Sequence, residues 1–340
     1  MKKILLAIIL LPLFNMVNSQ DTLVIHLKGG SVVTYPLTNI DSITFKVPHD
    51  TTTNDTAGTT SLIQLSKDDA QVQASDDEIM NDANAILTST NSAKSMDTII
   101  NSNLTITVDS INHGDTIVYT LVYNGFNTGH NFTRAGTVII EKLKGIHWST
   151  AGCLIIYRYI NLAITKVTDG KTFTYNGTRT WTNISGGLIK NLNGTTTITH
   201  QITGALQITF DNGVTRTWNI ARQRTWGGTF PSALTVTVNG IGSAGGYSNL
   251  VEWGTNRNGE AFYGQISTPI LYSYNNCLPY AWLPIWGVLV YQIPSVPKSG
   301  TVTFGYNSSD ALVTQGTCAD YYQLGWVVKT KSGTLYYIIP

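Results

Sequence analysis

The sequence predicts a mainly β protein, built as one large antiparallel meander that forms a sandwich or a folded-over, open barrel. A small N-terminal hairpin and one short acidic helix precede the meander. The first observation behind this prediction is alternation. From residue 101 to the end, apolar and polar residues alternate in segment after segment, such as TIVYTLVY, KTFTY and ALTVTV, and this is the period of a β-strand.

Turn signals and composition are the other two observations. Asn-Gly pairs accept the positive φ that hairpin turns require, and strands joined by short turns are antiparallel neighbours. Charged residues make up only 12% of the chain, whereas Thr, Tyr and Trp are frequent, as is typical of exposed sheets. The pairs recur at 124–125, 176–177, 193–194, 212–213, 239–240 and 258–259.

Residues 1–19 are typical of a secretory signal peptide. Lys2 and Lys3 supply the basic start, residues 5–14 form an apolar run, and Val17 and Ser19 suit the positions before a cleavage point. The apolar run is too short to cross a bilayer, and no later stretch approaches the length of a membrane helix. We therefore expect an exported protein without a transmembrane segment, located in the periplasm, at the cell surface or outside the cell.

Residues 20–47 predict an N-terminal β-hairpin module. In TLVIHLKGGSVVTYPL, two β-branched runs flank Gly29-Gly30, which is a hairpin signal, and NIDSITF predicts a third short strand. Residues 48–65 contain turn-forming residues without an apolar period, so we expect a linker there.

Residues 66–100 form an acidic segment in which we expect one short helix. Ser75-Asp76-Asp77-Glu78 fits a capping box, so Ser75 would begin the helix. Residues 101–340 then form the antiparallel β domain. The apolar face of the helix, which must pack on the β domain, consists of Ile79, Met80, Ala83, Ile86 and Leu87.

Charge is distributed unevenly, although the formal net charge is only +1. Residues 50–118 carry eleven acidic residues against two lysines, and residues 119–340 carry seven acidic residues against fifteen basic ones. One interpretation is a solvated acidic leader beside an ordinary β body. The other is that the leader docks on the body, or that the body meets an acidic partner.

A repeated TRTW motif places arginine and tryptophan on one side of a sheet, because side chains alternate along a strand. If the strands that carry the motif are neighbours, a ladder of guanidinium and indole groups would stabilise the sheet. The alternative is an exposed ligand face for a sugar ring or an anionic glycan. The candidate face consists of Arg179, Trp181, Arg216, Trp218, Arg224 and Trp226.

Three cysteines allow one disulfide bond in an oxidising compartment and leave one thiol. Cys153 lies in the apolar run AGCLIIY, which predicts a buried free thiol. Cys277 and Cys318 lie near turn-rich segments, and we expect these two to pair.

Two resemblances bear on the source of the chain. DTLVIHLKGGSVVTYPLTNIDSITF resembles a short leader at the mature N-terminus of many secreted and surface proteins of the Bacteroidetes. The order NFTRAGTVII, twin RTW segments, WGTNRNGEAF, Cys277, GVLVYQI, TVTFGY, QGTCAD with Cys318, and SGTLYYI is similar to uncharacterised, lipoprotein-like envelope proteins of that group. The second resemblance implies an all-β exported protein and no known activity. The chain lacks the lipid-attachment cysteine of the lipoprotein members.

No catalytic or metal-binding constellation is evident in the sequence. The six histidines come without a G-x-S-x-G elbow, and H-x-x-x-H, C-x-x-C and D-x-D-x-D-G are absent. We therefore expect no catalytic residue, no metal and no cofactor. Glu252 and Glu260 flank the NRNG turn and form the one candidate carboxylate pair for a glycosidase. Basic residues are scattered singly, so a nucleic-acid partner is not expected.

Asp followed by Ser or Thr and a small or aliphatic residue occurs six times before residue 118. The pattern resembles the O-glycosylation sequon of exported Bacteroidetes proteins, and an acidic, Thr-rich composition also produces such triplets. Thr56 is the candidate acceptor. Together these observations predict an exported, non-enzymatic structural or interaction protein of the cell envelope, whose partner is a glycan or another envelope component. The alternative is a carbohydrate-binding protein that uses the Arg/Trp face.

Overall fold

The computed structural model describes residues 22–26, 32–36, 56–89, 103–127, 130–273, 283–307, 309, 311–319, 321–328 and 331–338. The chain divides into two compact units, Met1–Asn54 and Asp55–Pro340. In the first unit, β1 (Thr22–His26) and β2 (Val32–Pro36) pair antiparallel, as the hairpin signal predicts. The expected third strand, in NIDSITF, lies outside the described residues.

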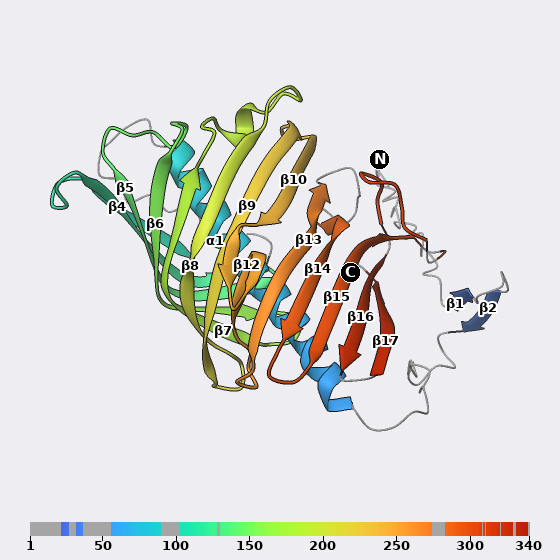
Figure 1. Ribbon diagram of the computed structural model, residues 1–340. Coiled ribbons are helices and arrows are strands. Elements are labelled where there is room, and N and C mark those ends of the chain that lie inside the picture. Colours follow the sequence, from blue (N-terminus) through green and yellow to red (C-terminus); the bar gives the residue numbers. More distant parts are fainter. Residues whose placement is uncertain are drawn as a thin grey trace, which may run out of the picture. The chain divides into compact units, whose positions relative to one another are not determined.

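The second unit contains one large antiparallel sheet, which confirms the predicted fold class. Neighbours follow chain order from β3 to β10 and from β13 to β17, and β10 and β12 share the position between β9 and β13. The sheet curves around a single helix, α1 (Thr56–Ser89) (Figure 1). The strands are β3 (Leu104–Asp109), β4 (Thr116–Phe126), β5 (Phe132–Leu143), β6 (Cys153–Lys166), β7 (Thr172–Asn183), β8 (Ile198–Thr209), β9 (Thr215–Thr229), β10 (Ala233–Gly240), β11 (Gly242–Ala244), β12 (Tyr247–Thr255), β13 (Ala261–Ser273), β14 (Leu283–Ile293), β15 (Lys298–Tyr306), β16 (Tyr321–Val328) and β17 (Lys331–Ile338). A short 3₁₀ helix, Ile189–Asn191, lies between β7 and β8.

Helix α1 is much longer than expected. It begins at Thr56, so the second half of the predicted linker is helical, and Ser75 lies in the middle of the helix instead of capping it. Ser75 Oγ instead accepts a hydrogen bond from the Tyr175 hydroxyl at 3.0 Å. The capping-box interpretation was therefore wrong, because a tertiary contact explains the serine.

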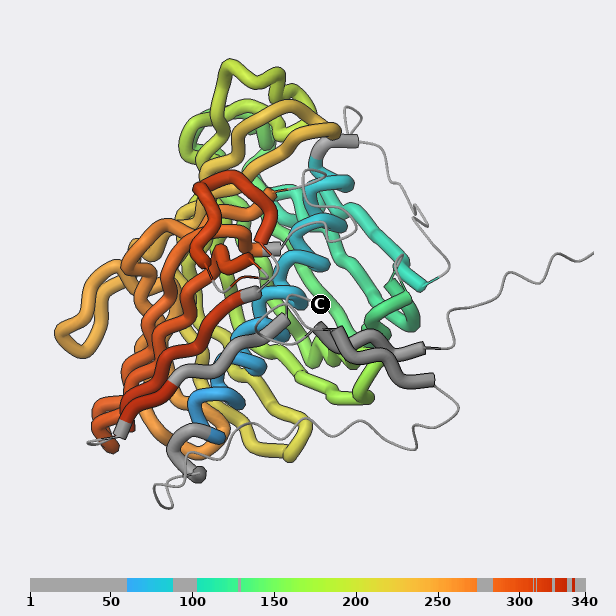
Figure 2. The backbone as a smooth tube through the Cα atoms, turned by 90° about the vertical axis from the view of Figure 1, so that its right-hand side faces the viewer, coloured from blue at the N-terminus to red at the C-terminus, as the bar shows by residue number. Residues whose placement is uncertain are grey.

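Helix α1 lacks a clear division into one apolar and one polar face, and its surroundings explain why. The sheet lies around most of the circumference of the helix (Figure 2), and the exposed positions form one narrow stripe. Acidic side chains occupy buried positions on the remaining surface, so the apolar period is interrupted where the helix meets the sheet. The exposed residues are Thr60, Lys67, Ala70, Asn81 and Ala85.

One hydrophobic core lies between α1 and the inward face of the sheet. The helix contributes fully buried residues such as Leu62 and Ile79, and the strands contribute Tyr175, Trp218 and Phe262. Such inward positions alternate along each strand with half-exposed, mostly Thr-rich positions on the outer face. The alternation that identifies the strands in the sequence therefore separates helix-facing from outward-facing side chains.

The Asn-Gly pairs divide into two structural classes. The pairs at 212–213 and 258–259 form turns, and Gly213 donates its N–H to the Phe210 carbonyl at 2.8 Å; 193–194 lies in a loop. The pairs at 124–125, 176–177 and 239–240 lie within strands, so the turn prediction was wrong there. At Gly177, with φ +130°, a Cβ atom would lie 2.7 Å from the Ala205 carbonyl oxygen. Glycine at 177 and 240 permits the close backbone approach of a strongly bent sheet.

Candidate functional site

A polar interface between α1 and the inward face of the sheet is the main chemical feature of the structure. Four arginines of the β domain form ion pairs with acidic residues of the helix, and each of these arginine side chains is at most 12% exposed. The acidic leader therefore docks on the basic body, as the second interpretation of the charge distribution proposes. The pairs are Arg134–Asp82, Arg179–Asp76, Arg224–Asp77 and Arg257–Asp68.

The TRTW motifs supply two of these arginines. Arg179 and Trp181 point inward from β7, and Arg224 points inward from β9, but β8 separates the two strands. In register, Arg179 lies opposite Gly204 on β8. A Cβ atom at Gly204 would lie 3.1 Å from Arg179 Cγ, so the glycine leaves space for the arginine side chain.

All six residues of the candidate ligand face belong to the side of the sheet that α1 covers. Arg179, Trp181, Trp218 and Arg224 are buried, and Arg216 and Trp226 are half-buried. A glycan would reach most of this face only if the helix moved away.

The tryptophans pack among aromatic rings. Trp181 lies against Trp148 and His200, with ring centroids 4.9 and 5.1 Å away. Trp218 lies 4.6 Å from the Phe262 ring. The guanidinium of Arg179 lies 5.9 Å from the Tyr159 centroid. Among the described residues, the cation–π contacts of the sheet thus involve tyrosine and phenylalanine where the sequence predicted tryptophan.

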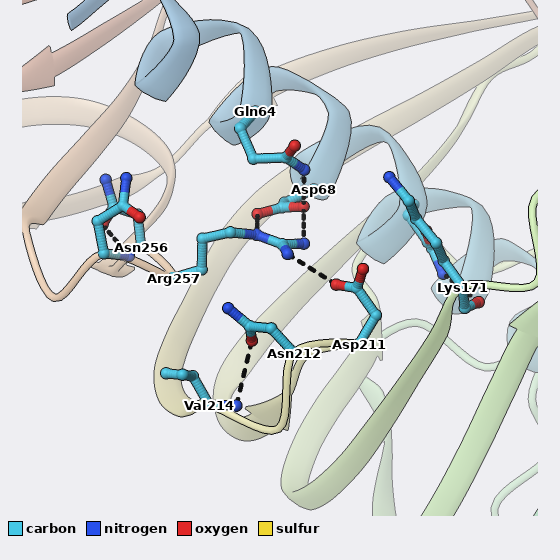
Figure 3. A network of polar contacts seen from close by, with 10 residues as sticks. Gln64, Asp68, Lys171, Asp211, Asn212, Val214, Asn256 and Arg257 are labelled. Carbon is cyan, nitrogen blue, oxygen red and sulfur yellow. Dashed lines mark hydrogen bonds and ion pairs between the residues drawn. The ribbon is translucent and has the colours of Figure 1, made fainter. Parts of the chain in front are cut away.

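Arg257 joins three separate parts of the chain (Figure 3). Its Nε and Nη2 atoms donate to the two carboxylate oxygens of Asp68 at 2.8 and 2.5 Å, and Nη1 donates to Asp211 at 2.7 Å. Gln64, one helical turn earlier, donates to the same Asp68 carboxylate at 2.8 Å. Bidentate arginine–carboxylate geometry is the strongest kind of ion pair, so this network fixes the N-terminal half of α1 against the β8–β9 and β12–β13 turns.

A second cluster lies deeper and contains two carboxyl groups. Glu252 is fully buried and accepts a hydrogen bond from Trp218 Nε1 at 2.9 Å. Asp69, on the helix, accepts one from the Tyr291 hydroxyl at 2.7 Å. Burial, and then the nearby charge of Asp69, raise the pKa of Glu252 well above its ordinary value, while Arg222 opposes the shift. The fold therefore favours a protonated Glu252.

We expect Glu252→Gln to preserve stability at low pH and to remove part of its loss at high pH. Because the folded-state pKa of Glu252 is raised, wild-type stability is fully present below the unfolded-state pKa and falls as pH rises through the folded-state pKa. The limiting slope is about 1.4 kcal/mol per pH unit. Glutamine keeps the acceptor for Trp218 and carries no charge, so urea unfolding between pH 5 and 9 should show a shallower decline.

Glu141→Gln is the matched control for this change. Glu141 pairs with the half-exposed Arg158 at 2.8 Å on the outer face, so its neutralisation should leave the pH slope above 5 unchanged. Equal loss of stability at every pH in Glu252→Gln would show that the buried acid is ionised in the fold.

The two carboxyl groups of the candidate glycosidase pair have different hydrogen-bond partners. Glu252 faces Trp218, whereas Glu260 accepts hydrogen bonds from Ser61 and Asn256, each at 2.9 Å, and forms an ion pair with Lys298 at 2.7 Å. These contacts lower the pKa of Glu260 against the effect of burial, with the Lys298 hydrogen bond the largest of them. Glu252 thus links β12 to β9, and Glu260 links the β12–β13 turn to α1 and β15.

His200 is buried between two tryptophans. Burial, with the charge of Arg224, lowers its pKa to about 3, so it is neutral at physiological pH. Among the described residues, no group of three or more His, Cys, Asp or Glu side chains has the arrangement of a metal site.

The predictions for the cysteines and for the O-glycosylation candidate Thr56 have different outcomes. Cys153 is a free, buried thiol, as predicted, and burial raises its pKa. Cys277 lies outside the described residues, so its pairing with Cys318 stays a prediction. Thr56 is the first residue of α1 and not a linker residue. The predicted signal peptide also lies outside the described residues.

Several interface residues had no distinguishing signal in the sequence. Asp68 and Asp69 contribute to the acidic charge of the leader, but nothing local identifies their partners Arg257 and Tyr291, which lie about 190 and 220 positions away in the chain. The uneven charge distribution was the only available indication.

Comparison of the chain with protein-family models, with curated proteins and with solved structures gives no match. In the part of the chain that the structure describes, the helices lack the combination of length and apolarity that crossing a bilayer requires.

Proposed function

We propose that this is an exported, non-enzymatic interaction protein of a bacterial cell envelope, and that it binds another envelope protein through the outer face of its first strands. The observation that carries the proposal is the position of its exposed apolar side chains. Among the described residues, thirteen large apolar side chains are exposed, and nine of them lie between residues 111 and 184, within or beside β3–β7.

The outer face of β4–β7 has the character of a contact surface. Val122 on β4 and Ile160 on β6 are 42% and 43% exposed, and each pairs in register with Thr137 of β5 between them. Leu143 and Leu154, at the adjoining ends of β5 and β6, are 54% and 46% exposed. The exposed Arg158–Glu141 ion pair lies on the same face, and clustered exposed apolar groups with polar neighbours mark protein contact sites.

The enclosed interior supports a structural role for the charged residues. Asp68, Asp76, Arg179 and Arg257 hold the helix to the sheet, and Glu260 joins α1 to β15 through Ser61 and Lys298. These ion pairs and hydrogen bonds lie within the fold, and the outer face is the surface open to a partner.

The test is cross-linking of the tagged protein in envelope preparations of a Bacteroidetes host, followed by mass spectrometry. We expect one reproducible partner, cross-linked near β4–β7, and expect Leu154→Glu to reduce its recovery about tenfold or more. Val327→Glu is the matched control, because Val327 is equally exposed, at 44%, but lies on β16; it should leave recovery unchanged.

Two results would contradict the proposal. One is an unmodified N-terminus at Met1 in protein recovered from the host, since export predicts a chain that begins after about Ser19. The other is equal recovery with Leu154→Glu and Val327→Glu, provided that circular dichroism shows both variants to be folded.

A further inference from the structure

A small cavity lies between α1 and strands β6, β7 and β8. Its volume is about 10 Å³, at the lower limit of what a single small occupant such as a water molecule requires. Its lining combines a helix carboxylate with aromatic and guanidinium groups of the sheet. The lining residues are Asp76, Met80, Tyr157, Tyr159, Arg179, Thr180, Trp181 and Ile202.

Three lining side chains have polar atoms without a hydrogen-bond partner among the described residues. These atoms are Arg179 Nε and Nη2, Trp181 Nε1 and the Tyr157 hydroxyl. The three side chains are only 2–3% exposed, so bulk water does not satisfy them. Buried polar groups are normally hydrogen-bonded, and this concentration at one cavity indicates an occupant.

The balance of donors and acceptors identifies the kind of occupant. The two arginine atoms and the indole nitrogen carry N–H groups that can only donate, and the tyrosine hydroxyl can donate as well. Asp76 already accepts a hydrogen bond from Arg179 Nη1. One water molecule has two lone pairs, whereas a halide ion accepts several hydrogen bonds without a directional limit and needs no acceptor in return.

Charge around the cavity also favours an anion. Arg222 and Arg224 lie on the same inward face of β9, and Arg222 is in register with Ile202, which in turn faces Trp181. Burial and the charge of Arg222 lower the pKa of Arg179, so the cluster contains mutual repulsion that a negative ion relieves. Asp76 and Asp77 offset part of this charge through their own ion pairs.

We propose that this cavity binds one chloride ion, held by Arg179 Nε and Nη2, Trp181 Nε1 and the Tyr157 hydroxyl. The ion completes the hydrogen bonding of the helix–sheet interface and stabilises the fold. This inference does not depend on the proposed envelope partner.

Bromide substitution tests the site directly. Crystals of the mature protein grown in sodium bromide should give an anomalous peak at the bromine edge inside the cavity, within hydrogen-bonding distance of Trp181 Nε1. Density without an anomalous signal would identify water and overturn the proposal.

Urea unfolding supplies the solution test. At constant ionic strength, which holds charge screening fixed, replacing sodium gluconate with sodium chloride should raise the unfolding midpoint of the wild type in a saturable way. Trp181→Phe removes one donor and leaves a smaller ring in the core, and we expect it to weaken the apparent chloride affinity about tenfold; Tyr157→Phe, which removes only a hydroxyl group, should weaken it to a smaller extent.

Trp218→Phe is the matched control, because its indole N–H donates to Glu252 and not to the cavity. It should lower stability in both salts and leave the chloride dependence unchanged. An identical midpoint for the wild type in the two salts, or the same chloride dependence in Trp181→Phe and the wild type, would overturn the proposal.

Discussion

Replacing Asp76 with Ala is expected to lower the free energy of unfolding by about 3–5 kcal/mol. Asp76 is 3% exposed and pairs with Arg179, whose side chain is 2% exposed. Removal of the carboxylate leaves a buried guanidinium without its counter-charge, and such uncompensated burial is far more costly than the loss of a surface ion pair. Urea unfolding followed by circular dichroism measures the change.

Two further variants test whether the loss of stability comes from the uncompensated charge of Arg179. Glu141→Gln breaks the half-exposed pair with Arg158 and should cost less than about 1 kcal/mol. The double variant Asp76→Leu/Arg179→Leu removes both charges, and we expect it to be more stable than Asp76→Ala. A double variant no more stable than the single one would show that the carboxylate supports the fold in some way other than through Arg179.

Gly204→Ala is expected to destabilise the protein by about 3 kcal/mol. Gly204 has φ +145° within β8, and a Cβ atom would lie 2.5 Å from the Thr178 carbonyl oxygen and 2.8 Å from Arg179 Cα. Both contacts involve the backbone of β7, so a side-chain rotation cannot relieve them. Thermal unfolding should show a clear decrease in the midpoint.

Gly213→Ala is the control for Gly204→Ala. Gly213 also has a positive φ, +78°, but a Cβ atom there would meet nothing within 4 Å. In Gly213→Ala the cost arises only because alanine disfavours a positive φ, and this costs about 1 kcal/mol. Equal effects of the two substitutions would mean that strand contact at Gly204 relaxes without cost.

The sheet was predictable because its signal is local. Alternation along TIVYTLVY or ALTVTV depends on each strand having one face toward the core, and this pattern is complete within a few residues. The same argument places Arg179 with Trp181 on one face of β7, which the structure confirms.

The start of the helix and its ion pairs with the sheet were harder to predict from the sequence. Asp68 and Asp76 interrupt the apolar period of α1, and their burial makes sense only with Arg257 and Arg179, which occur much later in the chain. Local propensity therefore favoured a start at Ser75, where a capping pattern is present by coincidence. The turn prediction for the Asn-Gly pair at 176–177 was wrong for a related reason. Glycine is needed there because of the close contact with Ala205 on the next strand, and not because of a turn.

The order in which α1 meets the strands has a consequence for biosynthesis. Glu78 and Asp82, late in the helix, contact Asn127 and Arg134, whereas Ser61, near its start, contacts Glu260. A ribosome releases the whole helix before any of these partners, and the partners then emerge in an order that covers it from its C-terminal end backward. A chain truncated before Glu260 would lack the partner of Ser61 near the start of the helix, so truncated chains of increasing length should acquire protease resistance in that same direction.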